Sequence, residues 1–250
     1  MQDTDLVSII TPMYNAKETI ESTIASVRAQ TYKNWEMIIV DDCSSDGSAA
    51  YVEQCASKDV RIRLIRHEHN CGIAETRNTA MQHARGRYVA FLDSDDLWLP
   101  QKLEKQISFM KEHDAAFSHT ACEVVDESGK KIGKTRHVPL QVKYDELLKG
   151  NVINCLTVVV DVKRIGCLIM PSIRHEDYAC WLGILQKEEY AWGLDEVLAE
   201  YREVGTSMSG NKFRVAQWQW SIYRNYLKLN LIKSIYCFVH YAWNALRKRI

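Results

Sequence analysis

The chain has 250 residues, 46% of them hydrophobic, which is enough to bury the core of one large domain or of a domain with an appendage. Its eight cysteines show no CxxC pair or other zinc-like spacing, so we expect free, reduced thiols rather than a zinc site or a disulfide framework. No run of about 18 uncharged apolar residues is present, and residues 1–5 lack a signal-peptide pattern. These features argue against a membrane-spanning or secreted protein.

The charges are unevenly distributed along the chain. Lys and Arg number 32, and so do Asp and Glu. However, the last acidic residue is Glu203, and residues 204–250 contain eight Lys and Arg. The pattern predicts an acidic body followed by a basic tail.

The first 100 residues alternate between strand-like and helix-like segments. The predicted strands cover residues 6–10, 36–40, 62–65 and 88–92, and the predicted helices cover residues 17–30, 48–58 and 73–84. Pro12 is expected to stop the first strand, because it lacks the N–H that a sheet requires. This alternation predicts right-handed βαβ units around a mostly parallel sheet.

The pattern is looser after residue 100. A helix is predicted over 101–113, an extended segment over 115–125, a hairpin turn over 126–130, a short helix over 144–149, a strong strand over 156–162 and a helix over 178–186. The fold class predicted from both halves is α/β, with a Rossmann-like sheet flanked by helices.

Polar side chains follow three of the predicted strands. Tyr14 follows the first strand, Asp42 the second, and Asp93 and Asp95 the strand at 88–92. Ligands of parallel sheets bind beyond the carboxyl ends of the strands, so we expect these residues to meet there. The first loop lacks GxGxxG, which argues against a dinucleotide-dependent dehydrogenase.

The stretch Phe91-Leu-Asp93-Ser-Asp95-Asp96 places three carboxylates at the end of a buried strand. Asp93 and Asp95 point to the same side if the backbone is still extended there. Hard oxygen ligands in this arrangement suit Mg²⁺ or Mn²⁺ and, through the metal, a diphosphate. The alternative is that these acids cap a helix beginning near residue 97.

Taken together, the motifs resemble family 2 glycosyltransferases of the GT-A fold, which build bacterial surface polysaccharides. The matching stretches are residues 8–15 (SIITPMYN), 41–48 (DDCSSDGS), 70–78 (NCGIAETRN), 91–96 (FLDSDD) and 176–181 (EDYACW), followed by Tyr201-Arg202 with Ser207 and Ser209. The order of the stretches is that of the family, and the last 40 residues lie outside the resemblance. The resemblance implies inverting transfer of a sugar from a nucleotide diphosphate, with uridine as the expected base, to a saccharide hydroxyl.

The resemblance also implies a role for each matching residue. Pro12 and Tyr14 would line the nucleotide base, and Asp42 would bind the polar edge of the base. Arg77 would approach the base or the diphosphate. We expect no nucleic-acid partner.

The remaining implied roles concern the metal and the chemistry. Asp93 and Asp95 would bind the ribose and a Mn²⁺ or Mg²⁺ cofactor, and Asp177 would be the catalytic base. Val204 stands where the family often has His or Arg after the Tyr-Arg pair. The role of that residue would be lost or taken by another group such as His175.

Other interpretations compete with this one. Haloacid-dehalogenase-like phosphotransferases also use a strand ending in DxD with Mg²⁺, although their first Asp usually lies early in the chain. A non-catalytic sugar-nucleotide-binding membrane protein is the second alternative. Individually, Tyr14 could cover the sheet edge, Asp42 could stabilise an Asx-turn, Arg77 could be a solvated helix residue and Asp177 could cap a helix.

The expected organisation is a glycosyltransferase domain over 1–212, with a nucleotide-sugar-binding half (1–100) and an acceptor-binding half (101–212), and a helical tail over 213–250. The tail mixes aromatic and basic residues. It either packs on the body or binds an anionic membrane surface, where a lipid-linked acceptor would be found. We expect a cytoplasmic protein, peripheral on the inner face of the cell membrane.

Overall fold

The computed structural model describes residues 5–203 and 212–247. The strands are β1 (Val7–Met13), β2 (Trp35–Asp41), β3 (Ile62–Arg66), β4 (Tyr88–Phe91), β5 (Leu97–Trp98), β6 (Phe117–Val125), β7 (Lys131–Arg136), β8 (Gln141–Val142), β9 (Val159–Asp161) and β10 (Ala191–Arg202). The helices are α1 (Ile20–Arg28), α2 (Ser48–Lys58), α3 (Ile73–Gln82), α4 (Lys102–Glu112), α5 (Tyr144–Leu147), α6 (Val162–Ile165), α7 (Glu176–Leu185), α8 (Lys212–Ser221) and α9 (Leu231–Arg247). A 3₁₀ turn lies at Cys155–Thr157 and a π-helical segment at Ile222–Tyr226.

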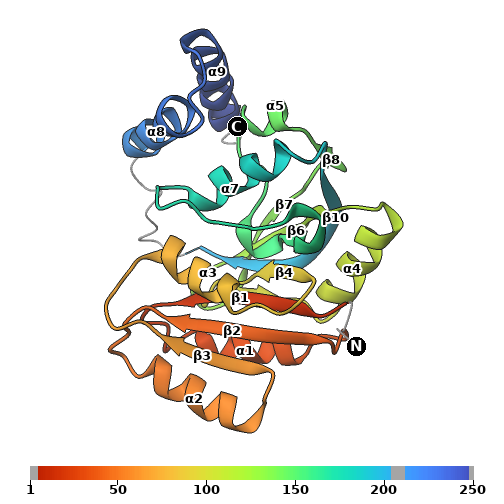
Figure 1. Ribbon diagram of the computed structural model, residues 1–250, viewed down its shortest axis with the longest axis vertical. Coiled ribbons are helices and arrows are strands. Elements are labelled where there is room, and N and C mark those ends of the chain that lie inside the picture. Colours follow the sequence, from red (N-terminus) through yellow and green to blue (C-terminus); the bar gives the residue numbers. More distant parts are fainter. Residues whose placement is uncertain (1–4, 204–211, 248–250) are drawn as a thin grey trace.

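Within these residues, the strands form one mixed sheet of ten, in the order β3-β2-β1-β4-β9-β6-β10-β5, with β7 paired to β6 and β8 to β10. Helices flank the sheet, and α2 and α9 lie at opposite ends of the long axis (Figure 1). The predicted α/β architecture with a C-terminal helical region is therefore confirmed. Parallel pairing holds for β3-β2-β1-β4 and for β6 with β10, whereas β9 pairs antiparallel with β4 and β6.

The first strand continues past Pro12, contrary to the prediction, and pairs with β2 as far as Met13. The N–H of Asp42 donates to the Met13 carbonyl, whereas the N–H of Leu92 donates to the Ile10 carbonyl. The backbone N–H and C=O groups of the odd-numbered residues of β1 thus point toward β2, and those of the even-numbered residues point toward β4. Because β4 ends at Phe91, opposite Ile10, the missing N–H of Pro12 points to a side without a strand partner.

The strand predicted over 156–162 is shorter than expected. Residues Cys155–Thr157 form a 3₁₀ turn, in which the Thr157 hydroxyl donates to the Asn154 carbonyl at 2.7 Å. The strand proper then ends at Asp161, whose carboxylate accepts the N–H of Lys163 and caps α6. Local side-chain bonds have replaced strand structure at both ends.

Alternate residues of the strands build separate cores on the two faces of the sheet. One core joins Ile9, Met37 and Ala90 to apolar residues of α1, α2 and α4. The other joins Ile10 and Phe91 to α3, α7 and the C-terminal helices. The strand period of two thus explains why both faces are covered by helices.

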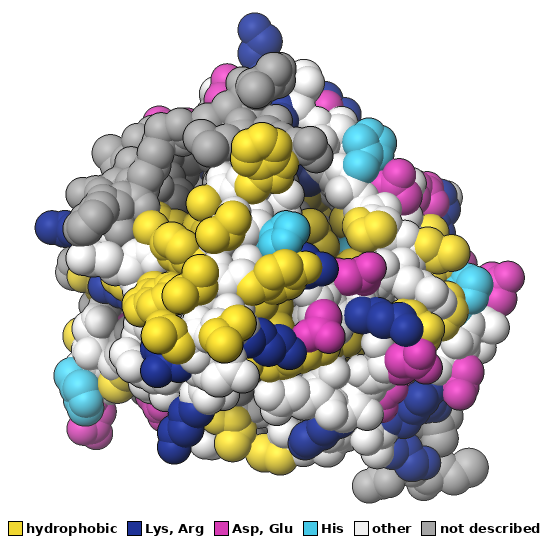
Figure 2. Space-filling view, turned by 90° about the horizontal axis from the view of Figure 1, so that it is seen from above, with side chains coloured by type: hydrophobic (Ala, Val, Ile, Leu, Met, Phe, Trp, Pro, Cys, Tyr) yellow, Lys and Arg dark blue, Asp and Glu magenta, His cyan; other side chains and the backbone are white. Residues whose placement is uncertain are grey.

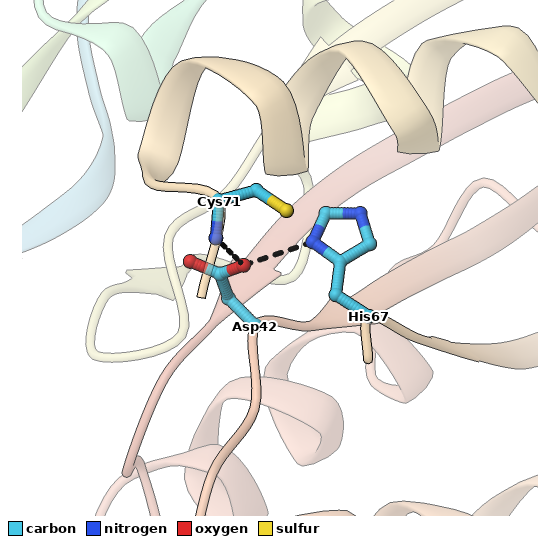
Figure 3. Close-up of side chains that lie close together, drawn as sticks. All are labelled: Asp42, His67 and Cys71. Atoms are coloured by element: carbon cyan, nitrogen blue, oxygen red, sulfur yellow. Dashed lines mark hydrogen bonds and ion pairs between the residues drawn. The ribbon is translucent and has the colours of Figure 1, made fainter. Parts of the chain in front are cut away.

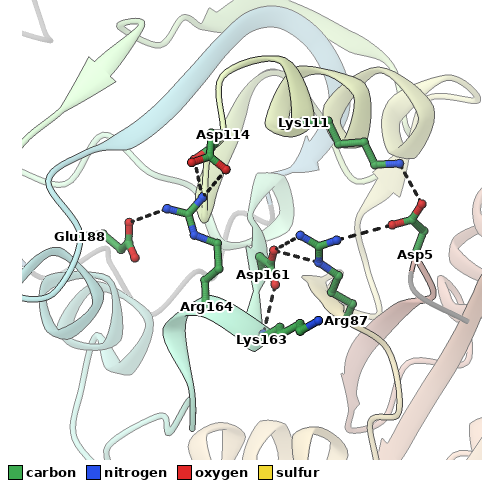
Figure 4. A network of polar contacts seen from close by, with 8 residues as sticks. All are labelled: Asp5, Arg87, Lys111, Asp114, Asp161, Lys163, Arg164 and Glu188. Carbon is green, nitrogen blue, oxygen red and sulfur yellow. Dashed lines mark hydrogen bonds and ion pairs between the residues drawn. The ribbon is translucent and has the colours of Figure 1, made fainter. Parts of the chain in front are cut away.

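A polar network ties the segment before β4 to the second half of the chain (Figure 4). Arg87 donates to the buried Asp161 carboxylate at 2.7 and 2.9 Å and approaches Asp5 within 3.8 Å. Lys111 of α4 binds the same Asp5 at 2.8 Å. The network fixes β9 beside β4, which continues the sheet from one half into the other.

The C-terminal helices pack on the body. Gln219 donates to the Tyr178 hydroxyl at 3.1 Å, and the Tyr223 hydroxyl donates to the Leu148 carbonyl. Lys233 forms an ion pair with Asp145 at 2.9 Å. In the part of the chain that the structure describes, no helix combines the length and hydropathy needed to cross a membrane.

Candidate active site

The loops after β1, β2 and β4 meet at one edge of the sheet. The chain runs outward from β1 to β3 and returns to β4 on the other side of β1, which creates a topological switch point. The N–H of Asn15 donates to the Ser44 hydroxyl, and the N–H of Lys17 donates to the Asp46 carboxylate, both at 2.8 Å. These bonds tie the first loop to the second.

A cavity of about 650 Å³ opens between these loops, and we call it the switch-point cavity. Its lining includes Tyr14, Asp42, Asp93 and Asp95, as predicted from the strand ends, and also Pro12, which the family resemblance implied. The Tyr14 side chain is 56% exposed, so its ring is accessible to a ligand. The structure thus brings together five of the seven predicted site residues.

Asp42 organises the wall of this cavity. Its Oδ1 accepts the N–H of Cys71 and faces His67 Nδ1, both at 2.8 Å (Figure 3). Its Oδ2 accepts the N–H of Gly72 at 2.9 Å. Gly72 can present its N–H because it adopts φ +84°, which suits glycine. Burial acts to raise the pKa of Asp42, but these hydrogen bonds outweigh it and lower the pKa.

His67 links Asp42 to α3. Since an ionised carboxylate only accepts, His67 Nδ1 carries the proton, and its Nε2 lies 2.9 Å from the Thr79 hydroxyl. Asp42, His67 and Cys71 also form a group that could hold a metal ion, with ligand atoms within 4.8 Å of one another. Asp42 is already bonded to His67 and to the backbone N–H of Cys71, and the Cys71 thiol lies 3.3 Å from the His69 carbonyl. These contacts, with a thiol pKa that partial desolvation and the charge of Asp42 raise, favour a structural network instead.

Three carboxylates crowd the loop after β4. Burial and the charge of Asp93 raise the pKa of Asp95 to about 6, and burial with both neighbouring acids raises that of Asp96 well above its ordinary value. The Thr23 hydroxyl lies 3.1 Å from the Ser94 carbonyl and 3.0 Å from the Asp96 carbonyl, and it shares its one proton between the two. Arg202 holds the loop from β10, because its N–H donates to the Asp96 carboxylate and its Nε to the Asp95 carbonyl, both at 2.8 Å.

This cluster fits a divalent cation chemically. Clustered hard oxygens whose mutual repulsion raises a pKa are stabilised when a cation neutralises them. Asp95 and Asp93 both line the switch-point cavity, whereas Asp96 is buried and engaged by Arg202. Asp95 and Asp93 are therefore the residues suited to hold Mg²⁺ or Mn²⁺.

Arg77 lies beside the acid loop and outside the lining of the switch-point cavity. It is 2% exposed. Its guanidinium donates to Asp93 Oδ1 and to Glu176 Oε1, both at 2.6 Å. Arg77 thus joins the acid loop to the start of α7. It also lines the neighbouring cavity described below, and its expected approach to the base or the diphosphate stays a prediction.

A second cavity of about 770 Å³, which we call the Asp177 cavity, lies next to the first. Asp177 lines it as the second residue of α7, whereas the helical spacing predicts a helix that begins at Tyr178. His175 precedes the helix in a left-handed conformation with φ 58° and also lines the cavity. Burial lowers the pKa of His175, which keeps its ring neutral near pH 7.

The two cavities adjoin. Gly72, Ile73, Asp93 and Arg174 line both of them. The predicted base Asp177 and the predicted nucleotide-binding residues therefore open into adjoining spaces, with Asp93 at the boundary.

Several residues at the site were missed by the sequence analysis. Glu176 pairs with Arg77, His67 supports Asp42, and Arg202 holds the acid loop. Glu176 and Arg202 belong to the stretches that match the family, so the sequence pointed to these positions but did not indicate what they do. Val204, Ser207 and Ser209 lie outside the described residues, and the structure leaves their expected roles as predictions.

Comparison with protein families decides the class of the protein. The family model described as "Glycosyl transferase family 2" matches residues 8–161, more than half of the chain. This chain belongs to glycosyl transferase family 2. The protein is therefore an enzyme, a glycosyltransferase, and the predicted family is confirmed.

Two relatives resemble this glycosyltransferase along its whole length. TuaG of Bacillus subtilis (strain 168), a glycosyltransferase assigned to teichuronic acid biosynthesis, is 47% identical over 246 residues, covering 98% of both chains. WfgD of Escherichia coli, named a UDP-Glc:alpha-D-GlcNAc-diphosphoundecaprenol beta-1,3-glucosyltransferase, is 38% identical over 247 residues, covering 98% of this chain and 96% of WfgD.

Solved structures agree on the fold. S. aureus TarS 1-349 in complex with UDP-GlcNAc superposes with a TM-score of 0.73 at 19% identity, covering 95% of this glycosyltransferase and 71% of that chain. The mannosyltransferase PcManGT from Pyrobaculum calidifontis, in complex with GDP-Man and Mn²⁺, gives 0.71 at 19%, covering 95% and 69%. These similarities confirm the GT-A fold.

Proposed function

We propose that the protein transfers a sugar, with inversion, from a uridine diphosphate sugar to a hydroxyl of a saccharide carried on a lipid diphosphate. The observation that carries this proposal is the junction of the switch-point cavity with the Asp177 cavity at Asp93. A donor in the first cavity and an acceptor in the second would meet beside Asp177. The name of WfgD, with a UDP-sugar donor and a diphosphoundecaprenol-linked acceptor, supports both substrate classes.

In this proposal the half of the chain formed by residues 1–100 binds the donor. Tyr14 stacks on the base, and Asp42 accepts a hydrogen bond from its polar edge. Asp42 suits this role because its carboxylate is fixed by three groups of the protein and stays ionised. Pro12 lines the same cavity beside Tyr14.

Asp177 acts as the general base. It removes the proton of the acceptor hydroxyl as the oxygen attacks the anomeric carbon, so a single displacement inverts that centre. A divalent cation held by Asp95 and Asp93 would neutralise the charge that develops on the leaving diphosphate. Arg77 keeps Asp93 and the start of α7 in register, so that the base and the acid loop hold a fixed separation.

The tail supplies a surface for membrane attachment. One side of α9 packs on the body through Ser234 and Cys237, which are buried. The other side exposes apolar side chains at helical spacing: Leu231, Ile232, Ile235, Tyr236, Val239 and Trp243. The face of the molecule seen from above also carries hydrophobic side chains beside Lys and Arg (Figure 2).

An exposed apolar helix face with basic neighbours suits the interface of an anionic bilayer. We therefore propose that α9 places the enzyme on the membrane surface where a lipid-linked acceptor lies. This combines the two predictions for the tail, because one face packs on the body and the other is available to lipid. Flotation with anionic vesicles should fall when Ile232 and Trp243 are changed to Ser, and equal flotation of both proteins would contradict the attachment.

The test of the reaction uses the full chain, Mn²⁺, a set of nucleotide sugars and a GlcNAc-diphosphate-lipid acceptor. We expect transfer from a UDP-sugar with an inverted product, detected by mass spectrometry and by NMR of the new linkage. Retention of configuration, or hydrolysis of aryl phosphates without sugar transfer, would contradict the proposal.

A further inference from the structure

A groove of about 400 Å³ lies beside the Asp177 cavity, and we call it the Trp218 groove. Its walls come from the loop before α7, from α8 and from the π-helical segment: Ile173, Arg174, Trp218, Ser221, Ile222, Asn225 and Tyr226. Most of this surface is apolar, and no acidic residue lines it among the described residues. The groove therefore suits an uncharged, apolar ligand segment.

The groove and the Asp177 cavity share a wall. Ile173, Arg174 and Trp218 line both spaces. Trp218 is held in this wall, since its ring and the His175 ring form a T-shaped pair with centroids 5.6 Å apart and the Arg174 guanidinium lies 5.5 Å from its ring centroid. A ligand that enters the Asp177 cavity can thus extend past Trp218 into the groove.

Arg174 marks the polar end of this path. Within the described chain it alone lines the switch-point cavity, the Asp177 cavity and the Trp218 groove. An Arg guanidinium offers a planar fork of donors that matches phosphate oxygens. The path therefore runs from a polar cavity, past a cation, into an apolar groove.

This sequence of environments matches one ligand from head to tail. We infer that the Trp218 groove binds the first isoprene units of a polyprenyl diphosphate-linked acceptor, with its diphosphate at Arg174 and its saccharide in the Asp177 cavity. Tyr226 is 42% exposed and precedes Leu231, the first exposed apolar residue of α9, so the chain can continue toward the face assigned to the membrane. The inference rests on the proposed lipid-linked acceptor and adds the site that selects its chain.

The experiment compares two acceptors that share one GlcNAc-diphosphate head. One carries a farnesyl tail and the other only a methyl group. Tyr226→Ser should raise KM for the farnesyl acceptor about tenfold, because apolar contacts with one isoprene region are lost, and should change KM for the methyl acceptor by less than about twofold. Tyr226→Leu, which keeps an apolar wall, should retain a KM close to that of the wild type for the farnesyl acceptor.

Val60→Ser is the matched control, because Val60 is 90% exposed and lies outside the three cavities. It should leave both KM values unchanged. Equal KM values of the wild type for the two acceptors would overturn the inference. A second outcome would also overturn it. If the wild type were a dimer that Tyr226→Ser dissociates, and the farnesyl group had no effect on KM, a second copy of the chain would fill the groove.

A binding measurement separates this inference from the proposed reaction. Calorimetry with farnesyl diphosphate, which carries no saccharide, should show binding to the wild type that Tyr226→Ser weakens about tenfold. If this binding is found but no sugar is transferred, the proposed function fails and the groove assignment stands. If transfer occurs but the farnesyl group changes neither binding nor KM, the groove assignment fails and the proposed reaction stands.

Discussion

The switch-point cavity and the Asp177 cavity differ in how the fold places their side chains. In the first, Tyr14, Asp42 and Asp93 lie just after β1, β2 and β4 in the parallel part of the sheet, so pairing of these strands brings them together. In the second, the lining comes from segments between Cys71 and Trp218, joined by contacts that are distant in sequence. The Arg77–Glu176 ion pair, which spans 99 residues, is one of these contacts, and both of its residues line this cavity.

The comparison teaches that the two cavities depend on different forces. Backbone pairing positions the first, and it survives the loss of single side chains because the sheet hydrogen bonds remain. Buried side-chain pairing positions the second, so one substitution can separate its walls. Substitutions on each side should therefore have different signatures in activity and in stability.

The largest expected effect concerns the acid loop of the switch-point cavity. Asp95→Ala should abolish sugar transfer while circular dichroism and thermal unfolding remain those of a folded protein, because the loop is fixed by backbone pairing and by Arg202. An excess of chelator should abolish activity in the wild type as well, and added Mn²⁺ or Mg²⁺ should restore it. Full activity of the wild type in chelator would contradict the metal assignment.

Arg77→Met should have the largest effect on stability. It leaves the Asp93 and Glu176 carboxylates without their cation, and breaking a buried ion pair from one side costs about 3–5 kcal/mol. Urea unfolding would measure this loss as a lower midpoint. Arg63→Met, which removes a one-third exposed guanidinium 3.6 Å from Glu36, is the matched control and should cost about 1 kcal/mol or less. Similar midpoints for both variants would show that Arg77 does not join the two regions.

Asp177→Asn tests the chemistry of the second cavity alone. Turnover should fall at least about a hundredfold, a typical contribution of general-base catalysis, because the amide cannot take the proton. Binding of the nucleotide diphosphate by calorimetry should be unchanged, since Asp177 does not line the switch-point cavity. Glu112→Gln, an exposed change in α4, is the control. If turnover persisted, Glu176 or His175 would replace Asp177 as the candidate base.

The sequence allowed prediction of the first cavity and only part of the second. Tyr14, Asp42, Asp93 and Asp95 were found because continuous apolar runs mark buried strands, and the carboxyl ends of parallel strands converge. Pro12 was found through the family resemblance alone. The position of Arg77 was not found, because nothing local to residues 73–84 shows that a residue near 176 packs against it. The Trp218 groove was missed for the same reason: helical spacing predicts a helix but not the surface on which it docks.

Asp95→Asn should stabilise the metal-free protein, although it removes a carboxylate that we assign to metal binding in the first cavity. The folded-state pKa of Asp95 is raised from 3.8 to about 6, so the folded protein binds more protons than the unfolded chain, and stability falls as pH rises from about 4 to above 6. The amide removes this penalty and should stabilise the metal-free protein by about 1–3 kcal/mol at pH 7.5, since one pKa unit corresponds to ~1.4 kcal/mol. The gain should shrink toward pH 4, where both forms are neutral. A gain that does not depend on pH would contradict the assigned cause.

The smallest expected effect concerns His67, which supports Asp42 from behind the cavity wall. His67→Ala removes one of the three bonds that hold the carboxylate and leaves the N–H groups of Cys71 and Gly72 in place. Binding of UDP should therefore weaken by only about 1 kcal/mol, or roughly fivefold in Kd, the net value of one hydrogen bond. His69→Ala, an exposed neighbour in the same loop, should leave the Kd unchanged. Because backbone N–H groups carry most of the support, the loss should stay small compared with that of Asp42→Ala, which removes the base-binding carboxylate itself. Equal losses in His67→Ala and Asp42→Ala would mean that a side-chain pair, and not the backbone, positions this cavity, and the contrast between the two regions would no longer hold.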